Sequence, residues 1–377
     1  MEKIKILHSG DYHLGEDHLQ FPKRRQEIMS SFLKMVDFCK QKQVDILLLA
    51  GDFLESVSVR HDELQTIIHA FHSLDSKIFI SPGNHDFYAI DSPYFKLTWP
   101  ENVTIFKPRM ERRDLPSLGI SIFGAGFSST YQKTPLMDQF KNIKVDPKNI
   151  NIMLMHGDLV SEGSSSKYNP ISKEAILASQ MDYFALGHIH IRSLENVGKT
   201  TYAYCGSPDG SSFAELGERG AYYLEITKEK KEITFVSFES RKYLRHTIKL
   251  DQEKSQKDLL DTIKEKLLED DDYQKNYYQI RLKGFRPKSL TIYPSYLEDS
   301  LLDFVSYLEI KDLTVPFYDL DNLLHQQNLV GYFVASILEE EKKAKEKGDK
   351  KQVKRLKQAL LYGLAAFDGK EQILDPS

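Results

Sequence analysis

Cysteine is scarce in this chain, and long apolar runs are absent. The 377 residues include two cysteines, Cys39 and Cys205, which lie far apart in the sequence. A disulfide framework is therefore not expected, and a reducing compartment is the natural setting. No apolar segment is long enough to span a membrane, and the opening MEKIKILHSGDYH runs straight into a polar motif without the pattern of a signal peptide. These features predict a cytoplasmic protein with no membrane contact.

A basic excess is also missing. The chain has 51 basic and 55 acidic residues, a net charge of -4 at pH 7 and a pI near 6.3, whereas a nucleic-acid-binding domain usually carries a clear positive charge. Lysines and arginines do gather at residues 107–113, 228–231 and 342–357, but such clusters are as often solvated surface as binding sites. The sequence also lacks a G-x-x-x-x-G-K-[ST] motif, which excludes a P-loop ATPase.

The chain is longer than one compact core usually holds, so more than one domain is expected. Strand and helix signals alternate in the first half, and residues 198–238 have the pattern of short strands that continue the core in an antiparallel arrangement. The pattern changes near Ser240, and the C-terminal segment is helical, with apolar positions three and four apart. We therefore predict a first domain at residues 1–240, a small α+β domain at 241–318 and C-terminal helices at 319–377.

Short polar motifs follow five of the apolar runs. They are Asp11-Tyr12-His13, Gly51-Asp52, Gly83-Asn84-His85-Asp86, His156-Gly157 and Gly187-His188-Ile189-His190. Continuous apolar strands of this kind form sheets that are covered on both faces, and ligands of such α/β sheets gather at the carboxyl ends of the strands. Residues far apart in the sequence are therefore expected to meet in one site.

The polar side chains in these motifs are those that bind hard and borderline divalent metals. The set consists of carboxylates, one amide and imidazoles, and seven such groups suit two adjacent ions. The predicted ligands are Asp11, His13, Asp52, Asn84, His156, His188 and His190. A single D-x-H or G-D motif is weak evidence because many proteins contain one, but the five motifs in this order after these strands are specific.

Two metal ions side by side are a known means of cleaving phosphate esters, because they neutralise the phosphate and lower the pKa of a bound water. Asp52 is the best candidate for a bridge between the ions, since its motif is a central one. His85 stands beside the ligand Asn84, where it can steady developing charge or protonate the leaving oxygen. The sequence thus predicts a dinuclear metallophosphoesterase with His85 as its catalytic residue.

The order of the motifs resembles the calcineurin-like metallophosphoesterase superfamily, and the opening HSGDYHLG is similar to the start of the SbcD nuclease subunits. Tyr204-Cys205-Gly206-Ser207-Pro208, followed by Ser212-Phe213-Ala214-Glu215 and Gly220, resembles the SbcD signature YPGS…SFxE…KG, with Cys205 in place of the usual proline. The implied fold is an α/β class β-sandwich flanked by helices, with a small α+β capping domain and C-terminal helices. The YhaO-type proteins are a related group that matches as well.

Carried over to this sequence, the resemblance implies two metal sites that share one carboxylate. One metal would be held by Asp11, His13, Asp52 and His190, and the second by Asp52, Asn84, His156 and His188. In the family the metals are typically manganese, and the enzyme is a homodimeric DNA exonuclease and endonuclease of repair and recombination. Its partner is an SbcC-type ABC ATPase with a long coiled coil. The apolar stripe of the C-terminal helices is expected to dock on this ATPase or, as the alternative, to pack against the chain's own capping domain.

A second residue also departs from the family pattern. Glu55 stands three residues after Asp52, where relatives often have histidine or aspartate, and this leaves the substrate preference open. The sequence assigns no residue to contact with DNA.

Three other functions compete with the nuclease. A small-molecule or cyclic-nucleotide phosphodiesterase would use the same metal core, but such a minimal core would end near residue 240. Protein phosphatases of the superfamily have GDxVDRG, whereas this sequence reads GDFLES. A catalytically inactive scaffold for the ATPase is disfavoured, because all seven ligand residues and His85 are present.

Overall fold

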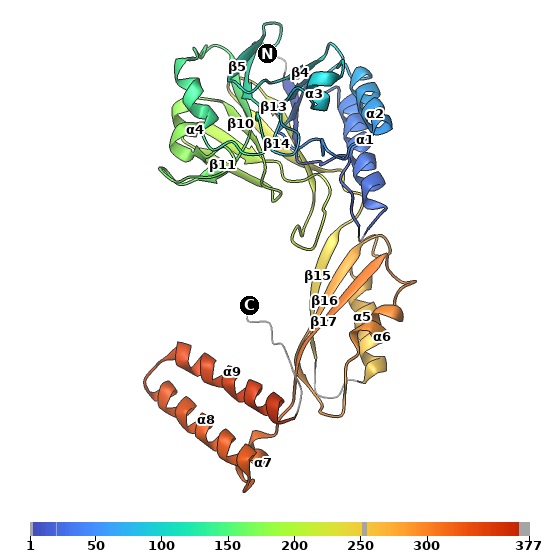
Figure 1. Cartoon of the computed structure of the whole chain (residues 1–377), viewed down its shortest axis with the longest axis vertical. Coiled ribbons are helices and arrows are strands. Elements are labelled where there is room, and N and C mark those ends of the chain that lie inside the picture. Colours follow the sequence, from blue (N-terminus) through green and yellow to red (C-terminus); the bar gives the residue numbers. More distant parts are fainter. Residues whose placement is uncertain (1–2, 20, 251–254, 369–377) are drawn as a thin grey trace. The chain divides into compact units, whose positions relative to one another are not determined.

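The structure is a computed structural model that describes residues 3–19, 21–250 and 255–368 (Figure 1). The chain separates into two compact units, residues 1–242 and 243–377. The last part of the predicted C-terminal helices, residues 369–377, lies outside the described residues. In the described part of the chain, no helix combines the length and the apolar character that a membrane crossing requires.

Two six-stranded mixed sheets form the centre of the first unit. The first sheet has the order β14-β13-β1-β2-β3-β4, and its strands are β1 (Ile4–Ser9), β2 (Ile46–Leu49), β3 (Lys77–Ile80), β4 (Val103–Ile105), β13 (Gly220–Ile226) and β14 (Lys231–Ser237). The second has the order β11-β12-β10-β7-β6-β5, and its strands are β5 (Glu111–Leu115), β6 (Ile120–Ala125), β7 (Ile150–His156), β10 (Tyr183–Gly187), β11 (Ser193–Val197) and β12 (Thr200–Tyr204).

The two sheets pack face to face, and helices cover their outer faces. Ile6 and Leu48 of the first sheet and Ile152 and Ala185 of the second are buried in the shared core. The outer helices and the small elements are α1 (Arg24–Lys42), α2 (His61–His72), α3 (Pro93–Lys96), η1 (Leu136–Asn142), α4 (Lys173–Ser179), β8 (Leu159–Val160) and β9 (Ile171–Ser172). Helices α1 and α2 pack on the first sheet, and η1 and α4 pack on the second. The predicted α/β sandwich flanked by helices is confirmed.

The strands after residue 198 differ in part from the prediction. β13 and β14 are antiparallel, as expected, and β13 pairs with β1. β12, however, runs parallel to β10, so the expected antiparallel continuation is wrong for this strand. The reason is that the edge strand β11 first runs back along β12 in a hairpin, and this second reversal returns the chain to the direction of β10.

The second unit begins with three parallel strands joined by two helices. The elements are β15 (Tyr243–Leu250), α5 (Gln256–Leu268), β16 (Tyr277–Arg286), α6 (Pro294–Asp299) and β17 (Tyr307–Pro316). β16 is the central strand and pairs in parallel with both neighbours. Because strands and helices alternate, this arrangement refines the expected α+β description. A reciprocal pair of hydrogen bonds between Ser255 and Asp258 caps the start of α5.

Three helices follow the small sheet: α7 (Leu320–Leu324), α8 (Leu329–Glu346) and α9 (Lys350–Phe367). Val334 of α8 and Leu360 and Leu364 of α9 are buried together with Tyr318. Leu329 and Tyr332 at the start of α8 remain 71% and 68% exposed. The assignment of separate capping and partner-docking domains to residues 241–318 and 319–377 stays a prediction.

Candidate metal centre

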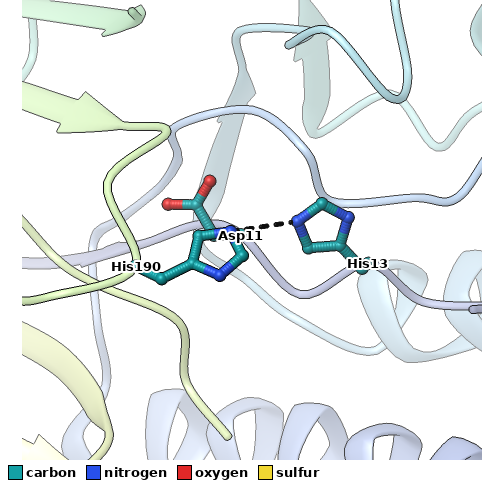
Figure 2. Close-up of side chains that lie close together, drawn as sticks. All are labelled: Asp11, His13 and His190. Carbon is teal, nitrogen blue, oxygen red and sulfur yellow. Dashed lines mark hydrogen bonds between the residues drawn. The ribbon is translucent and has the colours of Figure 1, made fainter. Parts of the chain in front are cut away.

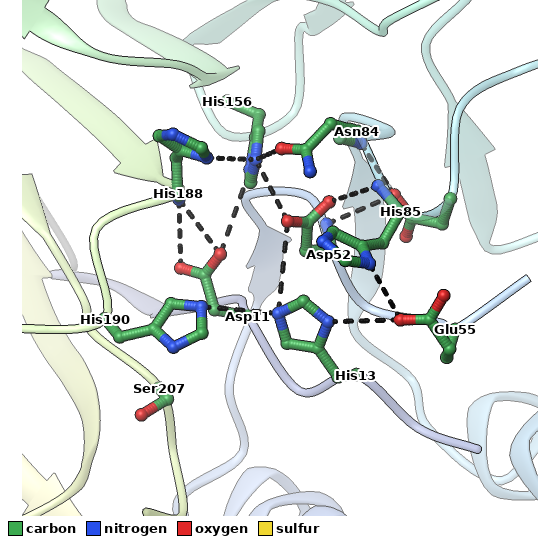
Figure 3. A network of polar contacts seen from close by, with 12 residues as sticks. Asp11, His13, Asp52, Glu55, Asn84, His85, His156, His188, His190 and Ser207 are labelled. Carbon is green, nitrogen blue, oxygen red and sulfur yellow. Dashed lines mark hydrogen bonds and ion pairs between the residues drawn. The ribbon is translucent and has the colours of Figure 1, made fainter. Parts of the chain in front are cut away.

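The five predicted motifs meet at one edge of the sandwich. β1, β2 and β3 of the first sheet and β7 and β10 of the second each end at a motif, because parallel strands direct their carboxyl ends to the same edge. All seven predicted ligand residues lie in the resulting network of contacts (Figure 3). A cavity of about 220 Å³ opens there, and most of the seven line it.

Asp11, His13 and His190 form the first group of potential ligands, with one donor atom from each within 4.8 Å of the others (Figure 2). The Nε2 atoms of His13 and His190 face each other at 3.3 Å. His190 is held through its other nitrogen, because Nδ1 donates a hydrogen bond of 2.5 Å to Glu215 Oε1. The Nε2 atom of His190 is therefore directed toward His13.

Asp52, His156 and His188 form the second group. His156 Nδ1 donates to the carbonyl oxygen of Ala50 at 2.9 Å, which directs Nε2 into the site. That Nε2 lies 3.0 Å from Asn84 Oδ1, 3.3 Å from Asp52 Oδ2 and 3.2 Å from His188 Nδ1. Four potential ligand atoms thus lie close together, with Nε2 of His156 within 3.3 Å of the other three.

Asp52 lies between the two groups. Its Oδ2 atom is 3.9 Å from His13 Nε2 and 3.3 Å from His156 Nε2, and its Oδ1 atom accepts a hydrogen bond of 2.9 Å from the backbone N–H of His85. Burial raises the pKa of the Asp52 carboxyl, but the adjacent His156 lowers it by more than burial raises it. The pKa of Asp52 is therefore below its usual value. This is the position that a bridging carboxylate requires.

The residues present fit two divalent cations. The imidazole nitrogens of His13 and His190 face each other at 3.3 Å, and a carboxylate holds the far nitrogen of His190, an arrangement typical of histidines that bind one metal ion. Burial raises the pKa of Asp11 to about 6, although the neighbouring His156, His190 and His13 act to lower it. A mixed set of carboxylates, imidazoles and one amide suits borderline and hard divalent metals.

His85 stands beside this centre and half-exposed, with 44% of its side chain accessible. Its Nδ1 lies 2.8 Å from Glu55 Oε2, and its ring meets that of His13 edge to face at 4.7 Å. The hydrogen bond to Glu55 raises the pKa of His85 above its usual value. Glu55 thus orients the ring of His85 from one side, and the contact with His13 places that ring next to the predicted metal ligands.

Glu55 therefore has a definite place in the site, which the sequence alone did not reveal. Its Oε2 atom contacts both His85 and, at 3.6 Å, Nδ1 of His13. Burial raises the pKa of Glu55, but the two histidines lower it to about 2, so the carboxylate is charged at neutral pH. His13, Glu55 and His85 also form a third cluster of potential ligand atoms.

Two carboxylates missed by the sequence reasoning hold the site together. Asp86, the last residue of its motif, is fully buried and accepts hydrogen bonds from the backbone N–H groups of Phe53 and Gly83 at 2.8 and 2.7 Å and from the Tyr94 hydroxyl at 2.6 Å. It joins the second and third motif loops. Asp158 lies 3.1 Å from His188 Nε2. Asp86 lies inside the third motif, and Asp158 lies two residues after the histidine of the fourth. This closeness to the motifs was the sequence feature that could have identified both residues.

The backbone of the site is strained where ligands leave the strands. Asp11, His13, Asp52 and His188 all have positive φ angles, between 45° and 102°, a conformation that costs free energy for residues other than glycine. Gly83 is needed for a different reason, since a Cβ atom there would lie 2.3 Å from Asp52 Oδ1. Such strain clusters at functional sites because the surrounding structure must impose it.

Glu215→Gln should weaken metal binding by about 10- to 100-fold. The amide keeps the shape of the side chain but loses the charge that fixes the proton of His190 on Nδ1. Titration calorimetry with Mn²⁺ measures the effect, and Glu218→Gln is the matched control because Glu218 is an exposed residue of the same loop. Equal metal affinities in the two variants would contradict the role given to Glu215.

Residues 4–192 of the chain match the calcineurin-like phosphoesterase family. Since the match covers half of the chain, the protein belongs to this family of hydrolases that act on phosphoester bonds. A dinuclear metal site is a property of the family, and the two groups of potential ligands described above correspond to it.

The chain is also similar, at lower identity, to three curated proteins. It is 27% identical over 241 residues to an uncharacterized metallophosphoesterase, YhaO, of Bacillus subtilis, a match that covers 59% of this chain and 58% of YhaO. It is 23% identical over 237 residues to the DNA double-strand break repair protein Mre11 of Methanopyrus kandleri, covering 58% and 52%. Mre11 of Methanococcus maripaludis is 23% identical over 332 residues, covering 83% and 82%. The chain thus spans little more than half the length of the first two relatives.

Proposed function

We propose that this phosphoesterase is a manganese-dependent nuclease that cleaves DNA phosphodiester bonds with two metal ions. The observation that carries the proposal is the arrangement of seven ligand-type side chains from five strand ends, with Asp52 between the other six. In this assignment the first metal is held by Asp11, His13, Asp52 and His190, and the second by Asp52, Asn84, His156 and His188. His85 is the catalytic residue.

When bound, two divalent cations supply a nucleophilic water of lowered pKa and neutralise the charge of the phosphate. The protein contributes the orientation of the ligands: Ala50 and Glu215 fix the far nitrogens of His156 and His190. Glu55 accepts a hydrogen bond from Nδ1 of His85 and raises the pKa of the ring. The protonated ring then carries a second proton on Nε2, which the leaving oxygen receives. Deep burial of Asp52 excludes water from the shared carboxylate.

The choice of DNA as substrate has two sources of support. Two of the relatives are named as DNA double-strand break repair proteins, and one of these matches extends over most of the chain. The segment that resembles the SbcD signature also serves the site directly, since Glu215 holds His190 and the Tyr204 hydroxyl donates to the carbonyl oxygen of Gly157 at 2.8 Å. We therefore favour an SbcD-type subunit of a homodimer that acts with an SbcC-type ABC ATPase.

Parallel assays on three substrates test the proposed function. The purified protein is incubated with Mn²⁺, Mg²⁺ or chelator on duplex DNA, single-stranded DNA and bis-p-nitrophenyl phosphate, with and without the ATPase partner. We expect Mn²⁺-dependent cleavage of DNA and of the small diester. Hydrolysis of small diesters or cyclic nucleotides without any DNA cleavage would instead favour the small-molecule phosphodiesterase.

Removal of residues 319–377 should abolish binding of the ATPase but leave hydrolysis of bis-p-nitrophenyl phosphate within about twofold. The reason is that α8 exposes Leu329 and Tyr332, and an apolar stripe on a helix is normally buried against a partner. Co-purification with the coiled-coil ATPase measures the first effect.

Because Tyr318 packs against α8 and α9, truncation can also disturb the small sheet. The full-length double variant Leu329→Ser, Tyr332→Ser avoids this problem. Its matched control is Tyr293→Ser, Leu302→Ser, at two other exposed apolar residues of the same unit. Undiminished binding of the ATPase by the α8 variant would contradict the docking role.

A further inference from the structure

In the described part of the second unit, α5 and α6 cover one face of the parallel sheet, and the other face meets the cluster of α8 and α9 only at Val315, near the end of β17. Leu259 of α5 and Leu297 of α6 are buried against Ile248, Ile280 and Ile310 of the sheet, and Figure 1 shows both helices on the same side of it. In the described part of this unit, no further helix contributes to that core. Parallel sheets are normally covered on both faces, so the second face is unusual.

The side chains of this second face follow from strand alternation and register. Tyr243, Tyr277 and Gln279 of this face are buried, and Val315 packs against the cluster of α8 and α9. The other members are Arg245, Thr247 and Lys249 of β15, Arg281, Lys283 and Phe285 of β16, and Tyr307, Glu309, Lys311 and Leu313 of β17. We call this set the open face. Five of its members are basic and one is acidic, although the whole chain carries a net charge of -4. The open face is therefore a local concentration of positive charge.

The basic residues of the open face are direct neighbours across the strands. Lys249 is in register with Lys283, and Arg281 is in register with Lys311. Like charges opposite each other destabilise a sheet, and Glu309 offsets this only in part, through its contact of 3.4 Å with Lys311. Burial and the neighbouring Arg281 also lower the pKa of Arg245. A bound polyanion would remove the repulsion.

Exposed aromatic side chains stand next to these charges. Phe285 follows Lys283 on the open face and is 48% exposed. Phe317, just beyond the end of β17, is 41% exposed, and the two rings meet edge to face with centroids 6.3 Å apart. Cationic side chains that follow a backbone, together with aromatic rings that stack on bases, are the features that bind single-stranded nucleic acids.

We propose that the open face of β15, β16 and β17 binds a single strand of nucleic acid, with Lys249, Lys283 and Lys311 on the phosphates and Phe285 under a base. The proposal rests on the proposed function in taking nucleic acid as the partner, but it concerns a surface apart from the metal centre. An acidic protein surface would satisfy the charges and would not need the exposed phenyl rings. The aromatic pair therefore favours the nucleic acid.

Binding of a fluorescent oligothymidine, measured by anisotropy in chelator over a series of salt concentrations, tests this proposal. The variant Lys249→Gln, Lys283→Gln, Lys311→Gln should bind more weakly, with a dependence of log K on log salt that is less steep by about 2, since each phosphate contact on a single strand contributes about 0.7. The matched control makes the same change at Lys257, Lys264 and Lys266 of α5, on the opposite side of the sheet, and should bind like the unmodified protein.

Phe285→Ala tests the proposed base stacking separately from the contacts of the lysines with phosphate, because the substitution does not change the charge of the protein. It should weaken binding of the single strand by roughly fivefold or more, as expected for the loss of one stacked base, and should change binding of a duplex of the same length by much less. Unaltered affinity in the Phe285 variant, or equal losses in the two lysine variants, would overturn the proposal.

Two further measurements separate this proposal from the proposed nuclease function. Thermal unfolding checks that each variant is folded, and hydrolysis of bis-p-nitrophenyl phosphate should be unchanged in all of them, because none of the altered residues belongs to the metal centre. A protein that never hydrolyses the diester refutes the nuclease function, whereas one that hydrolyses it but binds the oligonucleotide equally well with and without the lysines refutes only the open face.

Discussion

Asp52→Asn should reduce hydrolysis of DNA and of bis-p-nitrophenyl phosphate together, by about 10³-fold or more. Asp52 contacts His13 of one ligand group and His156 of the other, so the loss of its charge weakens both metal sites. Two-metal stabilisation of the transition state is worth several kcal/mol, and each 1.36 kcal/mol corresponds to about tenfold in rate. Steady-state rates at saturating Mn²⁺, with the metal content determined for each sample, measure the effect.

Asp75→Asn is the matched control, because the same chemical change then falls on an exposed turn between α2 and β3. We expect normal rates and normal metal content in this variant. Rates of the Asp52 variant within tenfold of the unmodified protein, at full metal content, would show that the two ligand groups do not share this carboxylate.

His85→Ala should lower the rate of DNA cleavage by about 10²–10⁴-fold while both metals remain bound. The side chain lies beside the ligand groups and is oriented by Glu55, so its removal takes away a proton donor and leaves the predicted ligands intact. Metal analysis and rates on DNA measure the two effects, and His72→Ala at the exposed end of α2 is the matched control.

The choice of substrate makes this result specific. p-Nitrophenolate leaves without protonation, whereas the alkoxide of a DNA strand needs a proton. The His85 variant should therefore lose much less activity on bis-p-nitrophenyl phosphate than on DNA. Equal losses on the two substrates would mean that His85 stabilises charge on the phosphate and does not protonate the leaving oxygen.

The location of the site could be predicted from the sequence because each site residue lies close to the end of a recognisable strand. Each motif follows a continuous apolar strand, and the ends of parallel strands converge whatever the details of packing. Asp11, Asp52 and His156 were therefore predictable as neighbours. The sandwich with outer helices was predictable for the same reason, since uninterrupted apolar strands must be covered on both faces.

Contacts between loops could not be predicted in the same way. The bond between Glu215 and His190 joins residues 25 positions apart, and no periodicity encodes which loop side chain reaches which ring nitrogen. Glu55 was noticed only as a departure from a family pattern, yet it contacts two histidines. The direction of β12 depended on a hairpin at the sheet edge, because an apolar strand carries no mark of its direction.

Anomalous scattering from crystals grown with Mn²⁺ tests the central claim most directly. We expect two peaks about 3.5–4 Å apart, with Asp52 as the shared ligand. Asp11, His13 and His190 should bind one ion, and Asn84, His156 and His188 the other. A single peak, or two peaks that leave His156 or His188 far from any metal, would contradict the dinuclear centre.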